Sequence, residues 1–390
     1  MKVKDRKKIL VLGEKYSDNL GDGVICKCFT ELLKRKCPEF EVICDDMSIR
    51  EDYMSPVKTH YGFLDRIKLF LRHIILDNKL AKIIEKKHFP NEYLYLLWRW
   101  HFNDKIALKH KYKGEKYAAI VFAGGELLKD DFVYKIENIV NYFNHTPVFF
   151  NACGVNYLND ALVTKKLKKI LKKKNVRRVT TRSISTVDSL FDKTTYKIVP
   201  DSAIATKDVF GIKPSRKWQL GLGIMAIWDN EEEKSGLYGF WEKTIEEVKK
   251  RGLSFKLFTN GDKSDYEFAL DLCKHCGLDD SMLLEKPTSP EKLVEEICCF
   301  NSIYTFRMHS AIIAYSYKIP FVCFSWDRKI NDFLNMTDLK KANLNWKTCK
   351  PSSALDTLLD VSFNEARYLE LRDVIDAELE TVTKLISKEK

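Results

Sequence analysis

The sequence predicts an α/β protein with two domains, each built around a parallel β-sheet. Short apolar segments alternate with helix-like segments from residue 9 to residue 324, and this order is typical of parallel strands joined by crossover helices. The chain has 390 residues and is 45% hydrophobic, which is enough for more than one hydrophobic core. A Lys-Pro-Ser-Arg linker at residues 213–216 separates the two alternating sets. We therefore expect domains of residues 1–210 and 211–345 and a helical tail of residues 346–390.

The first domain is expected to contain six strands. Their segments cover residues 9–13, 41–44, 118–123, 147–152, 176–181 and 196–199. A loop, Asn19-Leu20-Gly21-Asp22-Gly23, follows the first strand and precedes a helix over residues 24–36. Its glycines allow the backbone to approach a ligand at the helix start, whereas a tight turn with an aspartate cap is the alternative. Strand ends matter because ligands of open parallel sheets bind beyond the carboxyl ends of the strands.

A basic and aromatic segment, residues 55–115, interrupts the first domain and is predicted to be a helical insertion. From Arg66 to Lys116 there are 13 Lys and Arg residues against 5 Asp and Glu residues. The run from Tyr93 to Trp100 holds two tyrosines and two tryptophans, a composition typical of a sugar-stacking surface or an interfacial membrane contact. Packing in a core is the alternative for this run.

The second domain is expected to repeat the alternating pattern. Strands are predicted at residues 220–227, 254–258, 282–284, 302–306 and 320–324, with helices over residues 239–251 and 264–276. The last helix, residues 364–388, has no strand to pair with. We expect it to pack back across the first domain.

The formal net charge of +11 is concentrated in a few segments. Residues 165–178 carry nine Lys and Arg residues and no acidic residue. Such local positive charge attracts anions, although a solvated helix face, with the apolar residues on the other side, explains the same pattern. No nucleic-acid-binding module is recognisable, so a nucleic-acid partner is not expected.

The apolar segment near the N-terminus, residues 9–12, is too short for a secretion signal or a membrane span. The eleven cysteines are scattered, as is typical of reduced thiols. We expect a cytoplasmic protein, with peripheral contact at the inner face of the membrane as an open alternative. Cys273 and Cys276 have the spacing of half a zinc site but lack a matching second pair, so no metal is expected.

The tripeptide Arg307-Met308-His309 follows a predicted strand and opens a predicted helix. Residues two apart at such a turn can face one crevice, and a helix N-terminus favours a bound anion. An arginine can form two parallel hydrogen bonds to a carboxylate or phosphate, and a histidine can act as an acid near neutral pH. A surface arginine and a histidine bonded to a carbonyl are the alternative.

Several strand-end motifs occur in an order that resembles the polysaccharide pyruvyl transferase family. They are Asn19-x-Gly21-Asp22, Gly124-Gly125, Arg182-x-x-Ser185, Pro200-Asp201-x-Ala203 and Arg307-x-His309, followed by Pro320 and Lys329. The resemblance implies two Rossmann-like domains facing each other across a cleft, as in GT-B glycosyltransferases. It also implies transfer of an enolpyruvyl unit from phosphoenolpyruvate to an oligosaccharide or lipid-linked glycan, which forms a pyruvate ketal and releases phosphate without a cofactor.

The resemblance and the residue chemistry together assign roles. Catalytic roles are expected for His309, Arg307 and Asp22, donor binding for Arg182, Arg307, His309 and Lys329, and acceptor binding for Asn19, Gly21, Gly124, Gly125 and Asp201. Arg328 competes with Lys329 for the donor phosphate, and Asp22 and Asp201 compete for the role of base. The sequence departs from the family pattern at Glu126, where a third glycine is common, and at Ser183, where an acid is frequent.

Two other functions fit the same sequence. The first is a glycosyltransferase with a nucleotide-sugar donor, because a fold does not determine a reaction. The second is a catalytically silent protein that binds glycans or anions. Binding of phosphoenolpyruvate or of a nucleotide sugar separates the two enzymatic hypotheses.

Overall fold

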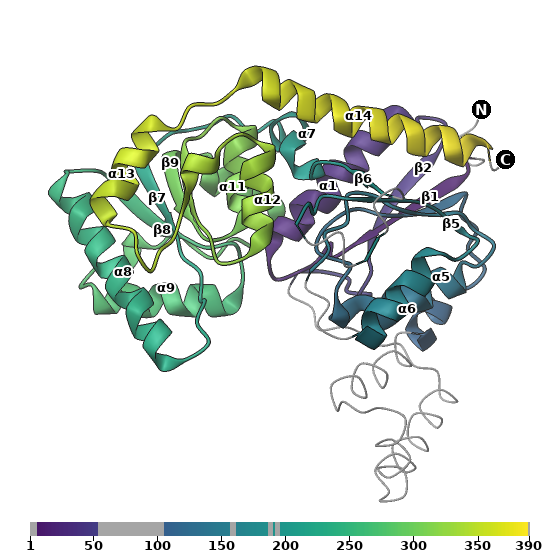
Figure 1. Ribbon diagram of the computed structural model, residues 1–390, viewed down its shortest axis with the longest axis horizontal. Helices are drawn as coiled ribbons and strands as arrows, with labels where there is room; N and C mark the ends of the chain where they lie inside the picture. The colour runs from purple at the N-terminus through teal and green to yellow at the C-terminus, as the bar shows by residue number, and fades with distance from the viewer. Residues whose placement is uncertain (1–5, 54–104, 157–160, 186–189, 192–195, 389–390) are drawn as a thin grey trace, which may run out of the picture.

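The computed structural model describes residues 6–53, 105–156, 161–185, 190–191 and 196–388. It consists of two lobes, each a parallel sheet with helices on both faces (Figure 1). Most of the predicted insertion, including the run from Tyr93 to Trp100, lies outside the described residues; residues 105–111 at its end are helical.

The first sheet has six parallel strands in the order β2-β1-β3-β4-β5-β6. They are β1 (Lys8–Gly13), β2 (Glu41–Asp46), β3 (Ala119–Phe122), β4 (Val148–Phe150), β5 (Val176–Thr181) and β6 (Lys197–Ile198). Ile9 and Val11 of β1 pack into one hydrophobic cluster, whereas Leu10 and Leu12 pack into another. Because helices cover both faces, the central strands are apolar at nearly every position. These continuous apolar runs are why the strands could be predicted from the sequence.

The helices of the first domain separate onto the two faces of its sheet (Figure 1). The helix α1 (Leu20–Lys36) packs on one face, and α5 (Val133–Tyr142) and α6 (Ala161–Leu171) pack on the other. In α6 the buried residues Val163, Leu167 and Ile170 recur at helical spacing, so one stripe faces the sheet and the lysines occupy the remainder.

The second sheet has five parallel strands in the order β11-β10-β9-β7-β8. They are β7 (Trp218–Gly223), β8 (Phe255–Phe258), β9 (Phe300–Thr305), β10 (Phe321–Phe324) and β11 (Asn343–Leu344). The helices α8 (Glu231–Lys250) and α9 (Lys263–His275) pack on one face, and α10 (Pro290–Ile297), α11 (Met308–Ser316) and α12 (Arg328–Met336) pack on the other.

The predicted strand at residues 282–284 was wrong. The chain forms a 3-10 turn over Asp280–Met282, and Leu283 makes only a single parallel bridge to Leu257. Asp279 accepts a hydrogen bond from the Ser281 amide, and such a side-chain cap stabilises the turn in place of a strand. The sheet edge that the sequence missed, β11, has only two residues.

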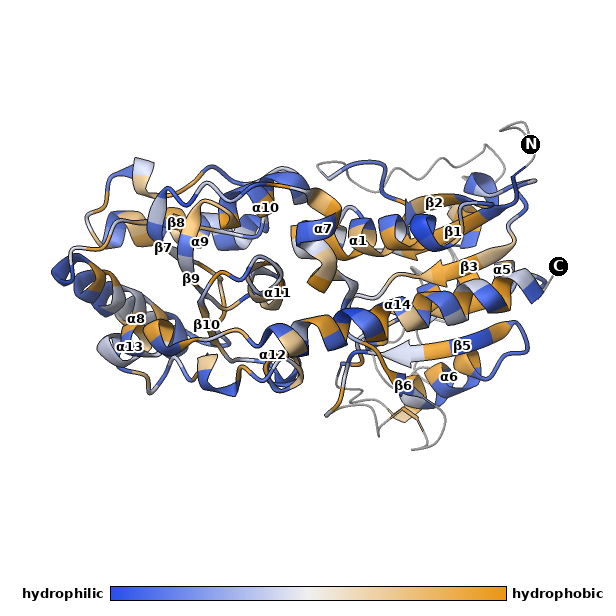
Figure 2. Ribbon diagram, turned by 90° about the horizontal axis from the view of Figure 1, so that it is seen from above, coloured by the Kyte–Doolittle hydropathy of each residue, from blue (hydrophilic) through white to orange (hydrophobic). Residues whose placement is uncertain are grey.

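The tail first packs on the second domain through α13 (Pro351–Asp360) and then returns across the first domain as α14 (Glu365–Lys388), as predicted (Figure 1). Polar and apolar residues alternate along α14 (Figure 2), and Leu371, Ile375 and Leu379 are buried. Arg178 of β5 donates from Nη2 to Oε2 of the buried Glu378 at 2.7 Å. Because an unpaired buried carboxylate is costly, this pair fixes α14 on the sheet.

One hydrophobic cluster is shared by the two domains. It contains Val24 and Ile25 of α1 together with Leu293 of α10 and Ile312 of α11. The Leu20 amide donates to the carbonyl oxygen of Asn260 in the other domain at 3.0 Å. The N-terminus of α1 is therefore held directly against the second domain, at the junction where the carboxyl ends of both sheets meet.

Candidate active site

The core of the site is a buried cluster of three charged or titratable side chains from both domains. Arg182 follows β5 and forms an ion pair with Asp201, which follows β6. Nη1 of Arg182 also lies 3.4 Å from Nε2 of His309, in the first turn of α11. Their exposed fractions are 8%, 5% and 6%. The structure therefore brings together Arg182, Asp201 and His309 from segments far apart in the sequence.

His309 is held in place by a very close approach of α1. A Cβ added to Gly21 would lie 2.6 Å from Cγ of His309, so no side chain fits at Gly21 unless the imidazole moves. Gly21 thus contacts the histidine ring, and its role as an acceptor-binding residue stays a prediction. The ring lies between the first turn of α1 and the Arg182 guanidinium.

Burial lowers the pKa of His309 below its ordinary value, and Arg182 and Lys329 lower it further, whereas Asp22 and Asp201 oppose the shift. The imidazole is therefore neutral near pH 7. The contact with Arg182 fits a tautomer whose Nε2 accepts a hydrogen bond, since arginine can only donate. A proton on Nε2 must therefore arrive with another change in the site, such as the binding of an anion.

Arg307 lies at the same strand end as His309 but makes different contacts. Nε of Arg307 donates to Oδ2 of Asp265 at 2.8 Å, and Nη2 lies 2.6 Å from the same oxygen. Asp265 is fully buried in α9, and burial raises the pKa of its carboxyl to about 6 although Arg307 opposes the shift. Arg307 caps α11 from a β conformation, whereas His309 is inside the helix, so the two side chains contact different domains.

Lys329 bridges the two domains. Its Nζ lies 2.6 Å from Oε2 of Glu126 in the first domain and 3.2 Å from Oδ2 of Asp327, and 4.9 Å from the ring centre of Trp326. Asp332 of α12 makes a second bridge, because its Oδ2 accepts from the Ile184 amide at 2.8 Å. The ammonium group of Lys329, predicted to hold a donor phosphate, is thus already paired with a carboxylate.

The two departures from the family pattern make different contacts. Glu126 binds Lys329 across the junction, as described above, whereas the Ser183 hydroxyl accepts a hydrogen bond from the Val155 amide at 2.9 Å within the first domain. Only Glu126 therefore helps to close the junction.

The loop predicted at residues 19–23 was wrong, because Asn19 is the N-cap of α1 and residues 20–23 form its first turn. The acceptor residues predicted there lie beside the cluster. Nδ2 of Asn19 donates to Asp22 at 3.3 Å, while Oδ1 of Asn19 is buried and has no hydrogen-bond partner among the described residues. Gly124 and Gly125 have φ angles of 93° and 77°, a region that only glycine adopts at little cost. A Cβ on Gly125 would lie 3.9 Å from Oδ1 of Asp22. The two predicted loops thus face each other.

Glu14 is a candidate that the sequence reasoning missed. It directly follows β1, and burial raises the pKa of its carboxyl to about 8, with a further increase from Asp22 and opposition from Lys129 and Lys135. The available signal was its position at a strand end, which is where ligands bind. Glu14 and Asp22 form a pair of interacting carboxyls, one of which retains a proton at neutral pH.

The space around the cluster is small. Two cavities that share Arg182, Ser183 and Lys329 have volumes of about 20 Å³ and 10 Å³, close to the room that one water molecule needs. An open groove of about 590 Å³ adjoins them and contains Trp326, Asp327 and Arg328. A small anion can enter beside Arg182 only if the interdomain ion pairs open, whereas the groove is large enough for a sugar.

The sequence motifs and this geometry agree with a comparison against known families. The model for polysaccharide pyruvyl transferases matches residues 19–328. The chain belongs to this family. The match begins at Asn19 and ends at Arg328, so it spans both sheets and the whole junction between them. None of the curated proteins matches this chain in sequence.

Proteins of known structure that share this architecture are distant in sequence. The UDP-GlcNAc 2-epimerase of Methanocaldococcus jannaschii is 9% identical, with a TM-score of 0.55 over 98% of this chain and 100% of that chain. A putative UDP-N-acetylglucosamine 2-epimerase of Listeria monocytogenes is 12% identical, with a TM-score of 0.54 over 95% and 91%. The epimerase of Rickettsia bellii is 11% identical, with a TM-score of 0.54 over 98% of both chains. These similarities establish the two-domain, Rossmann-like fold of the GT-B type and nothing about the reaction.

Two further features concern the described residues only. They contain no group of three or more His, Cys, Asp or Glu side chains arranged to hold a metal ion. Their helices include none with the length and hydrophobicity needed to cross a bilayer.

Proposed function

We propose that this protein transfers the enolpyruvyl unit of phosphoenolpyruvate to two hydroxyl groups of a glycan sugar, which forms a pyruvate ketal and releases phosphate. Family membership supports a pyruvyl transferase. The single observation that carries the finer proposal is the contact of His309 with Arg182 in a buried cluster that also faces Lys329. An acid and two cations around one small space suit a donor that carries a phosphate and a carboxylate.

Donor binding requires an exchange of partners. Arg182 is paired with Asp201, and Lys329 is paired with Glu126. An anionic donor competes with both carboxylates, and separation of Lys329 from Glu126 opens the junction where the donor must enter. Arg307 offers a third cation, since its Nη1 has no partner among the described residues and its side chain is 19% exposed. Its role as a donor-binding residue remains a prediction.

The proposed chemistry starts with protonation of the donor. The negative charge of the bound donor raises the pKa of His309, which then carries a proton on Nε2 and delivers it to the vinyl CH₂ carbon. The C2 carbon becomes cationic, and one sugar hydroxyl adds to it as its proton passes to a carboxylate. A second hydroxyl then displaces phosphate. Asp22 and Asp201 are the candidate bases, whereas Glu14, which is protonated at neutral pH, is a candidate proton carrier beside Asp22.

The open groove beside Lys329 is the proposed acceptor site. It is adjacent to the donor space, since Asn156 and Asp327 line both. Trp326 is 40% exposed there, and its indole nitrogen is fixed by a hydrogen bond to the Phe306 carbonyl oxygen at 2.9 Å. A rigid exposed indole is a suitable surface for one face of a sugar ring.

Thermal denaturation with candidate donors tests the proposal. Phosphoenolpyruvate, but not a nucleotide sugar, is expected to raise the melting temperature, because a ligand that binds only the folded state stabilises it. A shift with a nucleotide sugar alone would favour the glycosyltransferase hypothesis. Phosphate release with candidate oligosaccharides then tests turnover.

Donor binding is also expected to take up a proton near neutral pH, since the pKa of His309 is low in the free protein and rises in the complex. The affinity for phosphoenolpyruvate should therefore fall as the pH rises through the pKa of the complex. Titration calorimetry in two buffers of different ionisation enthalpy measures this uptake. If the His309→Gln variant takes up as many protons on donor binding as the unaltered protein, the proton binds to a group other than His309.

A further inference from the structure

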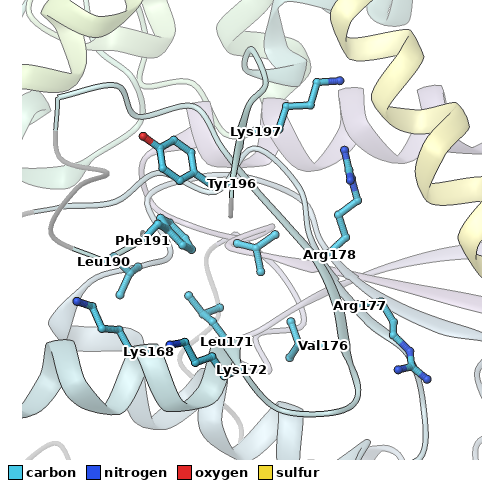
Figure 3. Close-up of a pocket in the computed structure, with 11 residues that line it drawn as sticks. Lys168, Leu171, Lys172, Val176, Arg177, Arg178, Leu190, Phe191, Tyr196 and Lys197 are labelled. Atoms are coloured by element: carbon cyan, nitrogen blue, oxygen red, sulfur yellow. The ribbon is translucent and has the colours of Figure 1, made fainter. Parts of the chain in front are cut away.

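A basic hollow on the first domain lies away from the candidate active site. Its volume is about 610 Å³, and it is lined by residues of α6 and β5 together with Leu190, Phe191 and Tyr196 (Figure 3). The hollow contacts Val176, Arg178 and Val179 in the first part of β5, whereas Arg182 lies beyond the other end of that strand. At about 3.3 Å per strand residue, the two sites are separate but joined by one rigid strand.

Five cations line the hollow. Nη1 of Arg177 donates to the Lys174 carbonyl oxygen at 2.9 Å, and its guanidinium points away from Lys168 and Lys172 (Figure 3). Arg178 and Lys197 pair with Glu378 of α14, so their charge is largely neutralised. Lys168 and Lys172 have no ion pair within the described part of the chain; Lys168 is in the last turn of α6 and Lys172 directly follows the helix, and both border the hollow (Figure 3). These two lysines supply the charge that is available to a ligand.

Two aromatic rings stand opposite the lysines. Phe191 and Tyr196 have ring centroids 5.4 Å apart and an interplanar angle of 38°, and Leu171 and Val176 add apolar surface between them and the lysines (Figure 3). Aromatic rings provide a broad apolar surface with little loss of side-chain entropy. The hollow thus combines a surface for the face of a ring with a positively charged edge.

The position of the hollow favours a single negative charge over a polyphosphate. Lys168 is near the C-terminal end of α6, where the helix dipole is negative, and Lys172 lies just beyond it. Phosphate groups of nucleotides are instead held at helix N-termini and glycine-rich loops beyond the carboxyl ends of strands. Among the described residues neither feature borders this hollow, whose strand residues belong to the opposite part of β5.

We propose that this hollow is a second carbohydrate site, which binds a sugar ring bearing a carboxylate. Phe191 and Tyr196 contact the face of the ring, and Lys168 and Lys172 bind the carboxylate. The ligand is either a uronic acid of a glycan or a sugar that carries a pyruvate ketal. The site does not depend on the proposed donor chemistry, because it is separate from the Arg182 cluster and its test measures binding without a donor.

The test compares a double charge reversal with a matched control on the same helix. Binding of a short oligogalacturonate is measured by titration calorimetry at physiological salt, with its neutral methyl ester as the second probe. K168E/K172E is expected to weaken oligogalacturonate binding about tenfold or more. K165E/K169E changes the same charge at the same spacing on residues that do not border the hollow, and it should bind as the unaltered protein does. K168Q/K172Q replaces the first variant if charge reversal prevents folding.

Further probes decide between the chemical sources. A monosaccharide with a pyruvate ketal that competes with oligogalacturonate identifies the ketal as a ligand, whereas no competition restricts the site to uronic acids. Phe191→Leu should weaken binding of the acid and binding of the methyl ester by a similar factor, since it removes only the contact between the aromatic ring and the sugar ring. The proposal is overturned if K165E/K169E loses as much affinity as K168E/K172E, if the ester binds as tightly as the acid, or if UDP displaces the acid at lower concentration.

Discussion

The two arginine–carboxylate pairs of the site differ in ways that the motifs do not reveal. Arg182 and Asp201 are both buried and belong to the first domain, and they meet His309 across the junction. Arg307 and Asp265 both belong to the second domain, and the Arg307 side chain is 19% exposed. The first pair borders the proposed proton donor, whereas the second contacts no residue of the Arg182 cluster among the described residues. We therefore expect the first pair to matter for both stability and donor binding, and Arg307 to matter chiefly for donor binding.

The largest effect is expected at His309, where the first pair meets the second domain. His309→Ala should lower turnover about a hundredfold or more, because it removes a proton donor, and it should weaken donor binding only by the part that proton uptake on His309 contributes. His309→Gln retains a hydrogen-bonding side chain but cannot deliver the proton, so it should be equally slow. Steady-state kinetics of phosphate release measure both variants. If the Gln variant retains nearly full turnover, His309 is not the proton donor, and that role would belong to Glu14, Asp22, Asp201 or Lys329.

The two arginines should respond differently to substitution. Arg182→Ala leaves the buried Asp201 carboxylate unpaired and should destabilise the fold by about 3–5 kcal/mol as well as abolish donor binding. Arg307→Ala should chiefly raise the donor Michaelis constant, by an amount that corresponds to about 2–4 kcal/mol of lost donor-binding free energy. Chemical denaturation and kinetics separate the two effects.

The double variant Arg182→Ala/Asp201→Asn is the control for the first arginine. It should recover much of the stability, because the amide is uncharged, but none of the donor affinity. If donor binding also recovers, Arg182 acts only as the partner of Asp201, and the comparison between the two pairs fails.

Breaking the ion pair between Lys329 and Glu126 should have a smaller effect on donor binding than the arginine substitutions, and it should strengthen binding where they weaken it. Glu126→Gln removes a carboxylate that competes with the donor for Lys329 and that closes the junction. The donor Michaelis constant is expected to fall several-fold, in line with about 0.5–1 kcal/mol for a partly exposed pair. Asp327→Asn is the matched control, since Asp327 also contacts Lys329 but does not bridge the domains. An increased Michaelis constant in the Glu126 variant would mean that the bridge holds the binding conformation.

The sequence predicted most of the fold because burial leaves a clear local pattern. Strands covered on both faces produce continuous apolar runs, and the six segments of the first domain coincide with β1 to β6 to within a few residues. The two-residue strand β11 and the turn at Asp280–Met282 have no such pattern. Elements whose structure depends on a capping side chain or on an edge position were therefore the ones predicted wrongly or missed.

The site was predicted less completely because its pairings are long-range. The strand-end positions of Arg182, Asp201 and His309 were recognisable from motifs, and the structure brings these three together. The sequence could not indicate that Arg307 binds Asp265, 42 residues away, or that Lys329 binds Glu126, 203 residues away. Glu14 was missed because the pKa of a carboxyl depends on burial and on Asp22, and neither its burial nor that proximity is visible locally.

The last prediction compares Glu14, at the junction, with a buried carboxyl outside it. Burial raises the pKa of Glu14 to about 8 and that of Glu296, in α10, to about 9. Between the ordinary carboxyl pKa and these raised values, Glu14 and Glu296 therefore keep their protons in the folded protein but lose them in the unfolded chain. The free energy of unfolding should fall as the pH rises from about 5 towards 8, by less than about 1.4 kcal/mol per pH unit for each proton.

Glu14→Gln and Glu296→Gln should each reduce this slope, because an amide does not titrate, and urea denaturation at several pH values measures it. Only Glu14→Gln should also alter the pH dependence of turnover, since Glu296 is in a different helix and contacts no residue of the Arg182 cluster within the described chain. Equal effects of the two variants on turnover would mean that Glu14 influences the site only through stability. A changed pH profile in the Glu14 variant alone would identify Glu14 and Asp22 as the carboxyl pair that accepts the proton of the sugar hydroxyl.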